Sequence, residues 1–193
     1  EPLWVAVEKS GGIAASFFWV GSEADIQGIR PTHYKRYDGR IENKLRVEQA
    51  LKWLQLPSNE RPDLITLYFS DVDSAGHNFG PDSIEVNEAI AKIDGEVGAL
   101  LDGLAALPFG VNLIITSDHG MSAVNEAAVK YLEDWIDLSL WTDDSKIING
   151  GAFAYFYSKN NDLLDSSINP LENIPGLQVF SKGNFLAQVH LGD

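Results

Sequence analysis

Residues 63–77 read DLITLYFSDVDSAGH, an apolar run that ends directly in two aspartates and a histidine, and this stretch decides the fold. The run at 63–70 follows Pro62 and is rich in aliphatic and aromatic residues, which predicts a strand. In sheets of parallel strands, functional groups collect just beyond the carboxyl ends of the strands. The polar residues from Asp71 onward occupy that place, so we expect them to carry function.

The rest of the chain alternates short apolar runs with amphipathic segments. Further strands are expected at 13–19, 111–116 and 152–157, and the run at 111–116 is apolar on both faces, as a central parallel strand would be. Apolar residues recur at helical spacing in 41–56 and in 84–107, which predicts two helices. This alternation predicts an α/β fold, a mostly parallel sheet with flanking helices.

Composition narrows the function. The 193 residues suffice for one domain with a sizeable core, and 14 basic against 28 acidic residues give a formal net charge of −14. So acidic a surface repels nucleic-acid duplexes and anionic lipid, unless bound divalent cations reverse the field locally. Cysteine is absent, which leaves His, Asp and Glu as metal ligands. No apolar run approaches the length of a transmembrane helix.

A second strand end repeats the pattern of the first. The expected strand at 111–116 runs into Ser117-Asp118-His119-Gly120-Met121. Asp and neutral His are good zinc ligands, and a metal needs several of them converging at about 2.0–2.2 Å. We therefore expect four residues to bind metal from two neighbouring loops, the first curled by its small residues and the second bent at a glycine: Asp73, His77, Asp118 and His119.

Ordinary structural roles compete with this interpretation. An aspartate after a strand commonly caps the next helix, and an isolated loop histidine is usually only solvated. The presence of both clusters at strand ends that can be neighbours favours the metal site. His33 and His190 have no such surroundings, and we interpret both as ordinary residues.

Several motifs resemble those of the nucleotide pyrophosphatase/phosphodiesterases of the alkaline phosphatase superfamily. They are TLYF at 66–69 with DVDSAGHNFGP at 71–81, ITSDHGM at 115–121, and FWVGS at 18–22 with IRP at 29–31. The resemblance implies an alkaline-phosphatase-like fold, with residues 1–193 forming the central part of a single phosphodiesterase catalytic domain, incomplete at both ends. It also implies a periplasmic, extracellular or membrane-anchored location.

The resemblance further implies a site with two Zn²⁺ ions. Asp73 and His77 would bind one ion, and Asp118 and His119 the other. A metal-activated threonine would attack phosphorus, and water would hydrolyse the covalent nucleotidyl-enzyme. Tyr37 matches the position at which the family stacks a ring on the nucleobase. Tyr68 matches a tyrosine that lines the same nucleotide pocket.

Parts of the family's site have no counterpart in this sequence. In the family, the nucleophilic threonine and one metal-binding aspartate precede the matching segment, and a last metal-binding histidine follows it. The chain's own threonines lie outside the nucleophile's context, and they are Thr32, Thr66, Thr116 and Thr142. With an incomplete ligand set we expect weak or no zinc binding and no turnover by this chain alone.

Three functions remain open. The first is hydrolysis of phosphodiester or pyrophosphate bonds in nucleotides or nucleotide derivatives by the intact protein. The second keeps the fold and the metals but acts on a phosphomonoester, a lysophospholipid or another choline phosphodiester. The third is a catalytically dead relative that serves as a binding module. Tyr37 favours a nucleobase, and the four retained ligand residues count against loss of catalysis.

Overall fold

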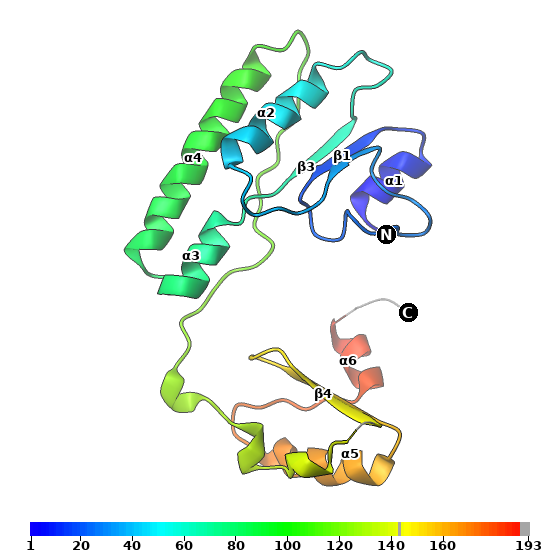
Figure 1. Ribbon diagram of the computed structural model, residues 1–193, viewed down its shortest axis with the longest axis vertical. Coiled ribbons are helices and arrows are strands. Elements are labelled where there is room, and N and C mark those ends of the chain that lie inside the picture. Colours follow the sequence, from blue (N-terminus) through cyan, green and yellow to red (C-terminus); the bar gives the residue numbers. More distant parts are fainter. Residues whose placement is uncertain (143, 190–193) are drawn as a thin grey trace. The chain divides into compact units, whose positions relative to one another are not determined.

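The computed structural model describes residues 1–142 and 144–189, which divide into two compact units. The first unit is Glu1–Val124 and the second is Asn125–Asp193 (Figure 1). Each unit is described by itself. None of the helices in the described ranges combines the length and apolar character that a membrane crossing requires.

The first unit is built on a small parallel sheet. Strand β1 (Ala14–Phe17) lies between β2 (His33–Lys35) and β3 (Leu64–Leu67), and both neighbours run parallel to it. All four residues of β1 are buried, as expected for a central strand covered on both faces. The carboxyl ends of β1 and β3 are in register, because Phe17 pairs with Leu67.

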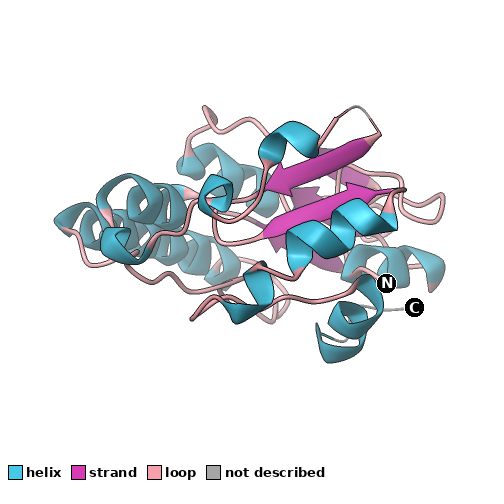
Figure 2. Cartoon of the chain, turned by 90° about the horizontal axis from the view of Figure 1, so that it is seen from below, coloured by secondary structure: helices cyan, strands magenta, loops and turns pink. Residues whose placement is uncertain are grey.

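Helices cover this sheet and provide its core. On one side, Ala15 and Phe17 of β1 pack with Trp53 of α2 (Asn43–Leu54). A second cluster joins Ala14 to two buried residues of α1 (Leu3–Lys9), Trp4 and Val5. Helix α4 (Ile84–Ala105) packs closely on α2, since a Cβ added at Gly103 would lie 2.4 Å from a Leu51 methyl carbon. Figure 2 distinguishes these helices and strands by colour.

The main predicted elements are confirmed. The strands expected at 13–19 and 63–70 are β1 and β3, and the helices expected at 41–56 and 84–107 are α2 and α4, each trimmed at its ends. Helix α4 begins at a serine cap, because the hydroxyl of Ser83 accepts a hydrogen bond from the backbone N–H of Val86. The prediction of an α/β fold with a parallel sheet and flanking helices is therefore correct.

The strand predicted at 111–116 is not formed. This segment has no regular secondary structure, and every residue from 111 to 120 is exposed. A strand that is apolar on both faces is stable only with paired neighbours and a covering layer on each side. In the described part of the chain, β3 pairs only with β1, and nothing pairs with this segment.

The stretch after β3 is also different from the expectation. It is a helix, α3 (Asp71–Phe79), and not a curled loop. Two aspartates in its first turn suit the positive end of the helix dipole, and Gly80, with a φ of 92°, follows its last residue. Ser74, Ala75 and Gly76 therefore continue a helix, and they do not serve to bend the chain.

The second unit contains an antiparallel hairpin, β4 (Ser145–Asn149) and β5 (Ala154–Ser158). The strand predicted at 152–157 thus forms, but it pairs with β4 and does not join the parallel sheet. A tight turn explains this, because Asn149 Oδ1 accepts from the Gly151 N–H and Gly151 takes a φ of 81°. The hairpin packs against a buried apolar cluster that consists of Ile136, Leu171 and Ile174.

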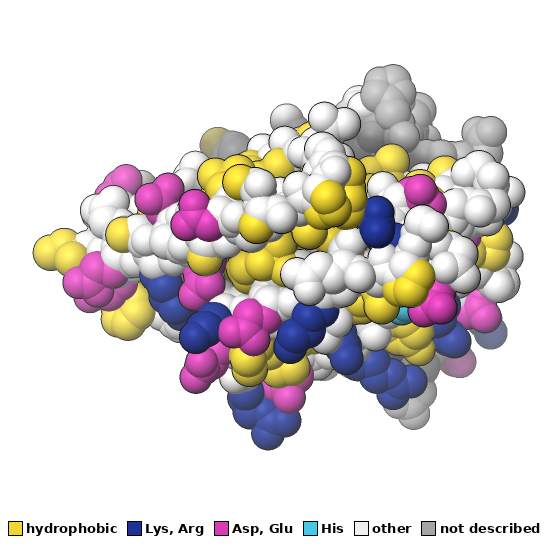
Figure 3. All heavy atoms as spheres, turned by 90° about the horizontal axis from the view of Figure 1, so that it is seen from above, with side chains coloured by type: hydrophobic (Ala, Val, Ile, Leu, Met, Phe, Trp, Pro, Cys, Tyr) yellow, Lys and Arg dark blue, Asp and Glu magenta, His cyan; other side chains and the backbone are white. Residues whose placement is uncertain are grey.

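The remaining elements of the second unit are helical. They are α5 (Asn161–Ile168), α6 (Lys182–Val189) and four short 3₁₀ turns, η1 (Glu126–Ala128), η2 (Leu132–Asp134), η3 (Leu138–Leu140) and η4 (Leu171–Asn173). On the face drawn in Figure 3, acidic, basic and apolar side chains are interspersed.

A buried chain of hydroxyl groups crosses the parallel sheet of the first unit. Thr66 Oγ1 donates to Ser16 Oγ (3.0 Å), Ser16 Oγ donates to Ser22 Oγ (2.8 Å), and Ser22 Oγ donates to the Trp19 carbonyl (2.7 Å). All three hydroxyl-bearing residues are buried. The chain therefore ties β3, β1 and the turn after β1 together.

Replacing Ser16 by alanine should lower the free energy of unfolding by about 1–3 kcal/mol, because the buried Thr66 hydroxyl loses its acceptor. Urea denaturation followed by tryptophan fluorescence measures this change. The exposed Ser58→Ala variant is the control and should match the wild type. Equal stabilities for the two variants would contradict the role given to the hydroxyl chain.

Candidate active site

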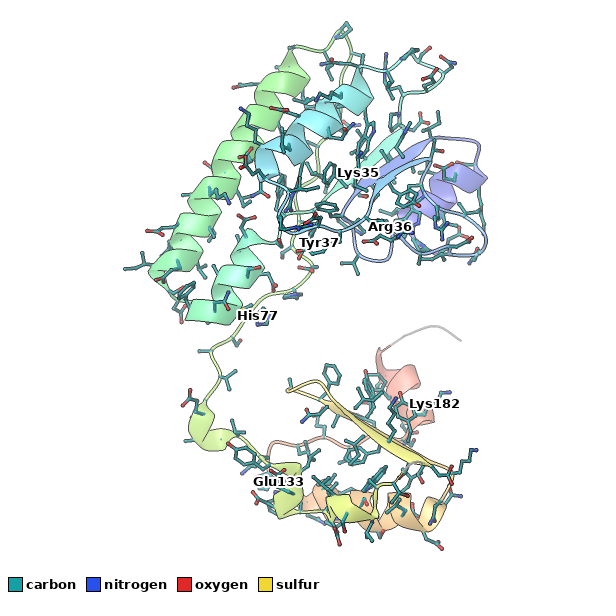
Figure 4. The ribbon with its side chains drawn as sticks, viewed as in Figure 1. Lys35, Arg36, Tyr37, His77, Glu133 and Lys182 are labelled. Atoms are coloured by element: carbon teal, nitrogen blue, oxygen red, sulfur yellow. The ribbon has the colours of Figure 1, made fainter. Side chains whose placement is uncertain are left out.

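Helix α3 presents Asp73 and His77 on one face. Residues four apart in a helix lie one above the other, so the two side chains meet. His77 Nε2 lies 3.4 Å from Asp73 Oδ1, and the imidazole is largely solvent-exposed. Figure 4 labels His77 on this helix and Tyr37 just beyond β2. The convergence predicted for this pair is therefore present, through helical spacing and not through a loop.

The second predicted pair approaches the same carboxylate. His119 Nε2 lies 3.8 Å from Asp73 Oδ1 and 3.7 Å from Asp118 Oδ2. Its Nδ1 lies 3.0 Å from the carbonyl oxygen of Gly120, so Nδ1–H donates there and Nε2 keeps its lone pair in the neutral ring. The hydrogen bond to Gly120 and then the charge of Asp118 raise the pKa of His119 above its ordinary value, with a smaller contribution from Asp73.

The spacing of these groups can be compared with that of a zinc site. Two ligand atoms bound to a tetrahedral zinc at about 2.0–2.1 Å lie about 3.4 Å apart. The pair on α3 has that separation, and the contacts of His119 are a few tenths of an ångström longer. No three His, Asp or Glu side chains in the described ranges, however, close round one point as a metal-holding group. The donor set fits zinc chemically and is arranged as pairs.

An aromatic pocket of about 420 Å³ contains both predicted substrate-binding tyrosines, and its lining is Phe18, Trp19, Val20, Gly21, Glu23, Ala24, Tyr37 and Tyr68. Tyr37 is 53% exposed and packs edge-on against Phe18, with ring centroids 5.2 Å apart. Burial and the charges of Asp73 and Asp118 raise the pKa of Tyr68. Tyr68 thus links the pocket electrostatically to the carboxylates of the two predicted ligand pairs.

Arg46 is a residue that sequence reasoning missed. Its side chain is buried, donates to the Ile41 and Tyr68 carbonyls, and lies 5.0 Å from the centre of the Phe18 ring. It therefore holds the end of β3 and one pocket wall together. The only sequence signal is its helical spacing from Asn43 and Ala50 on the buried face of α2.

Asp71 was not among the four predicted metal ligands, and it braces α3. Asn43 Nδ2 of α2 donates to Asp71 Oδ2 (2.8 Å), and Lys92 of α4 forms an ion pair with Asp71 Oδ1. Burial alone would raise the pKa of Asp71, but the bonds from Lys92 and Asn43 and the charges of Lys92 and Arg46 hold it below its usual value. One carboxylate thus joins three helices next to the ligand pair.

Of the other two histidines, His33 does not enter the cluster. His33 lies in β2 against Trp53, with ring centroids 6.0 Å apart, and its Nε2 is 3.3 Å from the Glu60 carbonyl oxygen. This is a structural environment. His190 lies outside the described residues. Gly120, expected to bend the second ligand loop, is not among the glycines with positive φ.

The fold and the site together define the class of this protein. A parallel α/β sheet with a carboxylate–imidazole pair on the helix after β3, approached by a second such pair, is an alkaline-phosphatase-like arrangement, and the chain superimposes on solved structures of that fold. Residues 1–175 match the family model of type I phosphodiesterase / nucleotide pyrophosphatase. The chain belongs to this family of hydrolases, as the motifs predicted.

Individual relatives agree with the family assignment. Human ectonucleotide pyrophosphatase/phosphodiesterase family member 1 is 44% identical over 138 residues, which is 70% of this chain and 15% of that protein. The venom phosphodiesterase of Macrovipera lebetinus is 43% identical over 139 residues, 71% of this chain and 16% of that protein. The chain therefore spans only a small part of the length of these relatives.

Solved structures match almost the whole chain. Murine ectonucleotide pyrophosphatase/phosphodiesterase 5 superimposes with a TM-score of 0.84 at 27% identity, over 98% of this chain and 50% of the other. An inactive variant of that murine protein was solved in complex with AMP and gives the same values. The human counterpart is 30% identical, also with a TM-score of 0.84, and has the same coverage of both chains.

Replacing Asp71 by asparagine should lower the free energy of unfolding at pH 7 by about 1.5 kcal/mol, because the charge-assisted bonds of α3 are lost. The folded-state pKa of Asp71 is lowered, so its stabilisation is present above the unfolded value and is lost as the pH falls through the folded one. Urea denaturation at pH 7 and pH 3.5 measures both stabilities.

The difference between wild type and Asp71→Asn should narrow at pH 3.5. Asp102→Asn, an exposed change on α4, is the matched control and should show no pH-dependent difference. If Asp71→Asn lowers the free energy of unfolding equally at both pH values, the charge of Asp71 is not the source of its stabilising effect.

Proposed function

We propose that the intact protein hydrolyses phosphodiester or pyrophosphate bonds of nucleotides or nucleotide derivatives at a two-zinc site. Membership of the family supports this function. The observation that carries it is the approach of both His77 and His119 to Asp73, from two separate segments, beside an aromatic pocket. An ordinary surface ion pair joins one histidine to one carboxylate, whereas here two histidines from separate segments approach the same carboxylate.

Each ion would be held by one residue pair, Asp73 with His77 and Asp118 with His119. When bound, two zinc ions supply Lewis acidity toward phosphoryl oxygens and lower the pKa of a hydroxyl nucleophile. The protein's own part is to hold the two imidazole rings facing the carboxylates. The Gly120 carbonyl selects the tautomer of the neutral His119 ring, because it accepts the Nδ1 proton and leaves the lone pair on Nε2.

The nucleophile is proposed to be a threonine outside these 193 residues. The inactive murine variant solved with AMP carries alanine in place of a threonine, which supports a threonine nucleophile. Three of the four threonines of this chain have other partners. Thr66 is buried and donates to Ser16, Thr32 donates to Glu8, and Thr116 donates to the Ser117 carbonyl.

The pocket is proposed to hold the nucleobase. Tyr37 offers an exposed ring for stacking, and Tyr68 lines the same pocket and is influenced by the charges of Asp73 and Asp118. The AMP bound to the inactive variant of a solved relative favours a nucleotide over the phosphomonoester and choline phosphodiester alternatives. The names of the relatives, an ectonucleotide enzyme and a venom enzyme, support a location outside the cell.

Replacing Asp118 by asparagine in the intact protein should reduce kcat/KM for a nitrophenyl ester of thymidine monophosphate by at least about a hundredfold, because a charged ligand is lost. Asp94→Asn, an exposed change on α4, is the matched control and should leave kcat/KM unchanged. Zinc content measured on the same samples should fall with Asp118→Asn only.

The isolated 193-residue chain should show no turnover of the same ester at any zinc concentration, because the proposed nucleophile is absent. Zinc-dependent hydrolysis by this chain would overturn the assignment of the nucleophile to another segment. Full activity of Asp118→Asn in the intact protein would overturn the metal site itself.

Replacing Tyr37 by alanine should weaken AMP binding to the intact protein roughly tenfold, because stacking of a base on a ring contributes about 1–3 kcal/mol. Isothermal titration calorimetry measures this affinity. Tyr37→Phe should bind AMP nearly as well as the wild type, since the ring is retained. Tyr131→Ala, an exposed tyrosine of the second unit, is the control. Equal AMP affinities for Tyr37→Ala and the wild type would contradict the placement of the nucleobase in this pocket.

A further inference from the structure

Gly76 and Met121 meet between the two ligand segments. Gly76 is buried in α3, and a Cβ added there would lie 2.5 Å from Met121 Sδ and 3.0 Å from Met121 Cε. Real Cβ atoms do not approach other atoms so closely, so only glycine leaves room for the thioether at this position. The methionine side chain therefore fills a notch in the helix that the missing Cβ creates.

The contact between Gly76 and Met121 lies close in sequence to both predicted ligand pairs. Gly76 lies three residues after Asp73 and one before His77, while Met121 lies three residues after Asp118 and two after His119. Residues 111–120 are all exposed, and Met121 is the first residue after them that is partly buried. The methionine side chain thus anchors the second ligand segment, directly beside the first ligand pair.

We propose that Met121, seated on Gly76, is the positioning contact that sets the distance between the Asp73–His77 pair and the Asp118–His119 pair. The inference rests on the proposed metal site and adds a residue pair that touches neither metal nor substrate. The separation of 3.8 Å between His119 Nε2 and Asp73 Oδ1 is the distance that this contact controls. A Cβ at position 76 displaces the thioether from this seat and so loosens the anchor of the second ligand segment.

Replacing Gly76 by alanine tests the proposal against a matched glycine. Gly98 also lies within a helix, α4, and a Cβ added there meets nothing within 4 Å. Both Gly→Ala changes improve helix propensity, so neither is expected to unfold the protein. In the intact protein, Gly76→Ala should weaken Co²⁺ binding at least tenfold, followed by its visible absorption, whereas Gly98→Ala should bind Co²⁺ as the wild type does.

A second pair of variants separates displacement of the methionine from other effects. Met121→Ala removes the anchor and should itself weaken Co²⁺ binding. In the Met121→Ala background, Gly76→Ala should have no further effect, because no thioether remains to be displaced. Additive losses in the double variant, or Co²⁺ binding by Gly76→Ala within twofold of the wild type, would overturn the proposal.

A measurement on the metal-free chain tests the contact between Met121 and Gly76 separately from the proposed metal site. The chain contains a single methionine, so methyl-labelled methionine gives one NMR signal from Met121 in these 193 residues. In the metal-free chain this methyl should show a nuclear Overhauser effect to the Gly76 α-protons, and Gly76→Ala should shift both the methyl and the His119 ring signals. Gly98→Ala should shift neither.

Failure of the wild type to bind Co²⁺ would count against the metal site, while the methyl contact would still be tested by the NMR signals. Absence of the contact, or unchanged His119 signals in Gly76→Ala, would overturn the positioning role even if the wild type binds Co²⁺.

Discussion

Parallel pairing of β1 with β3 is the constraint on which the candidate site depends. Because Phe17 pairs with Leu67, the residues that follow the two strands emerge at the same edge of the sheet. Phe18 follows β1 and forms one wall of the aromatic pocket, while Tyr68 and then Asp73 follow β3. Arg46 fixes this arrangement from below, since its guanidinium binds the Tyr68 carbonyl and lies over the Phe18 ring. The pocket and the placement of the Asp73–His77 pair are therefore consequences of one strand register.

Sequence patterns predicted the elements whose partners lie within the chain. Strand β1 is apolar because it is covered by α1 and α2, and α4 repeats at helical spacing because one face packs on α2. The pattern at 111–116 failed, since a run that is apolar on both faces forms a strand only where it is paired and covered, and no strand of the described residues pairs with it. Short elements such as α1 and β2 were missed because too few residues carry a period.

The site residues were predictable as residue types and not as geometry. An aspartate and a histidine four apart are equally compatible with a loop and with a helix, and only the structure shows that helical spacing brings Asp73 and His77 together. The roles of Arg46 and Asp71 could not be found from the sequence, because helical spacing can place Arg46 on the buried face of α2 but shows neither its bonds to carbonyls nor the sharing of the Asp71 carboxylate by three helices. The small residues of α3 were interpreted as bending elements, whereas Gly76 provides room for Met121.

The exposed segment 111–117 is also open to proteolysis. A protease must draw a stretch of backbone into its cleft, and this stretch has neither a strand partner in the described residues nor a covering layer. A single cut between residues 111 and 117 would leave Asp73 and His77 on one piece and Asp118 and His119 on the other. Covering this segment would thus protect the covalent continuity of the proposed metal site as well as its shape.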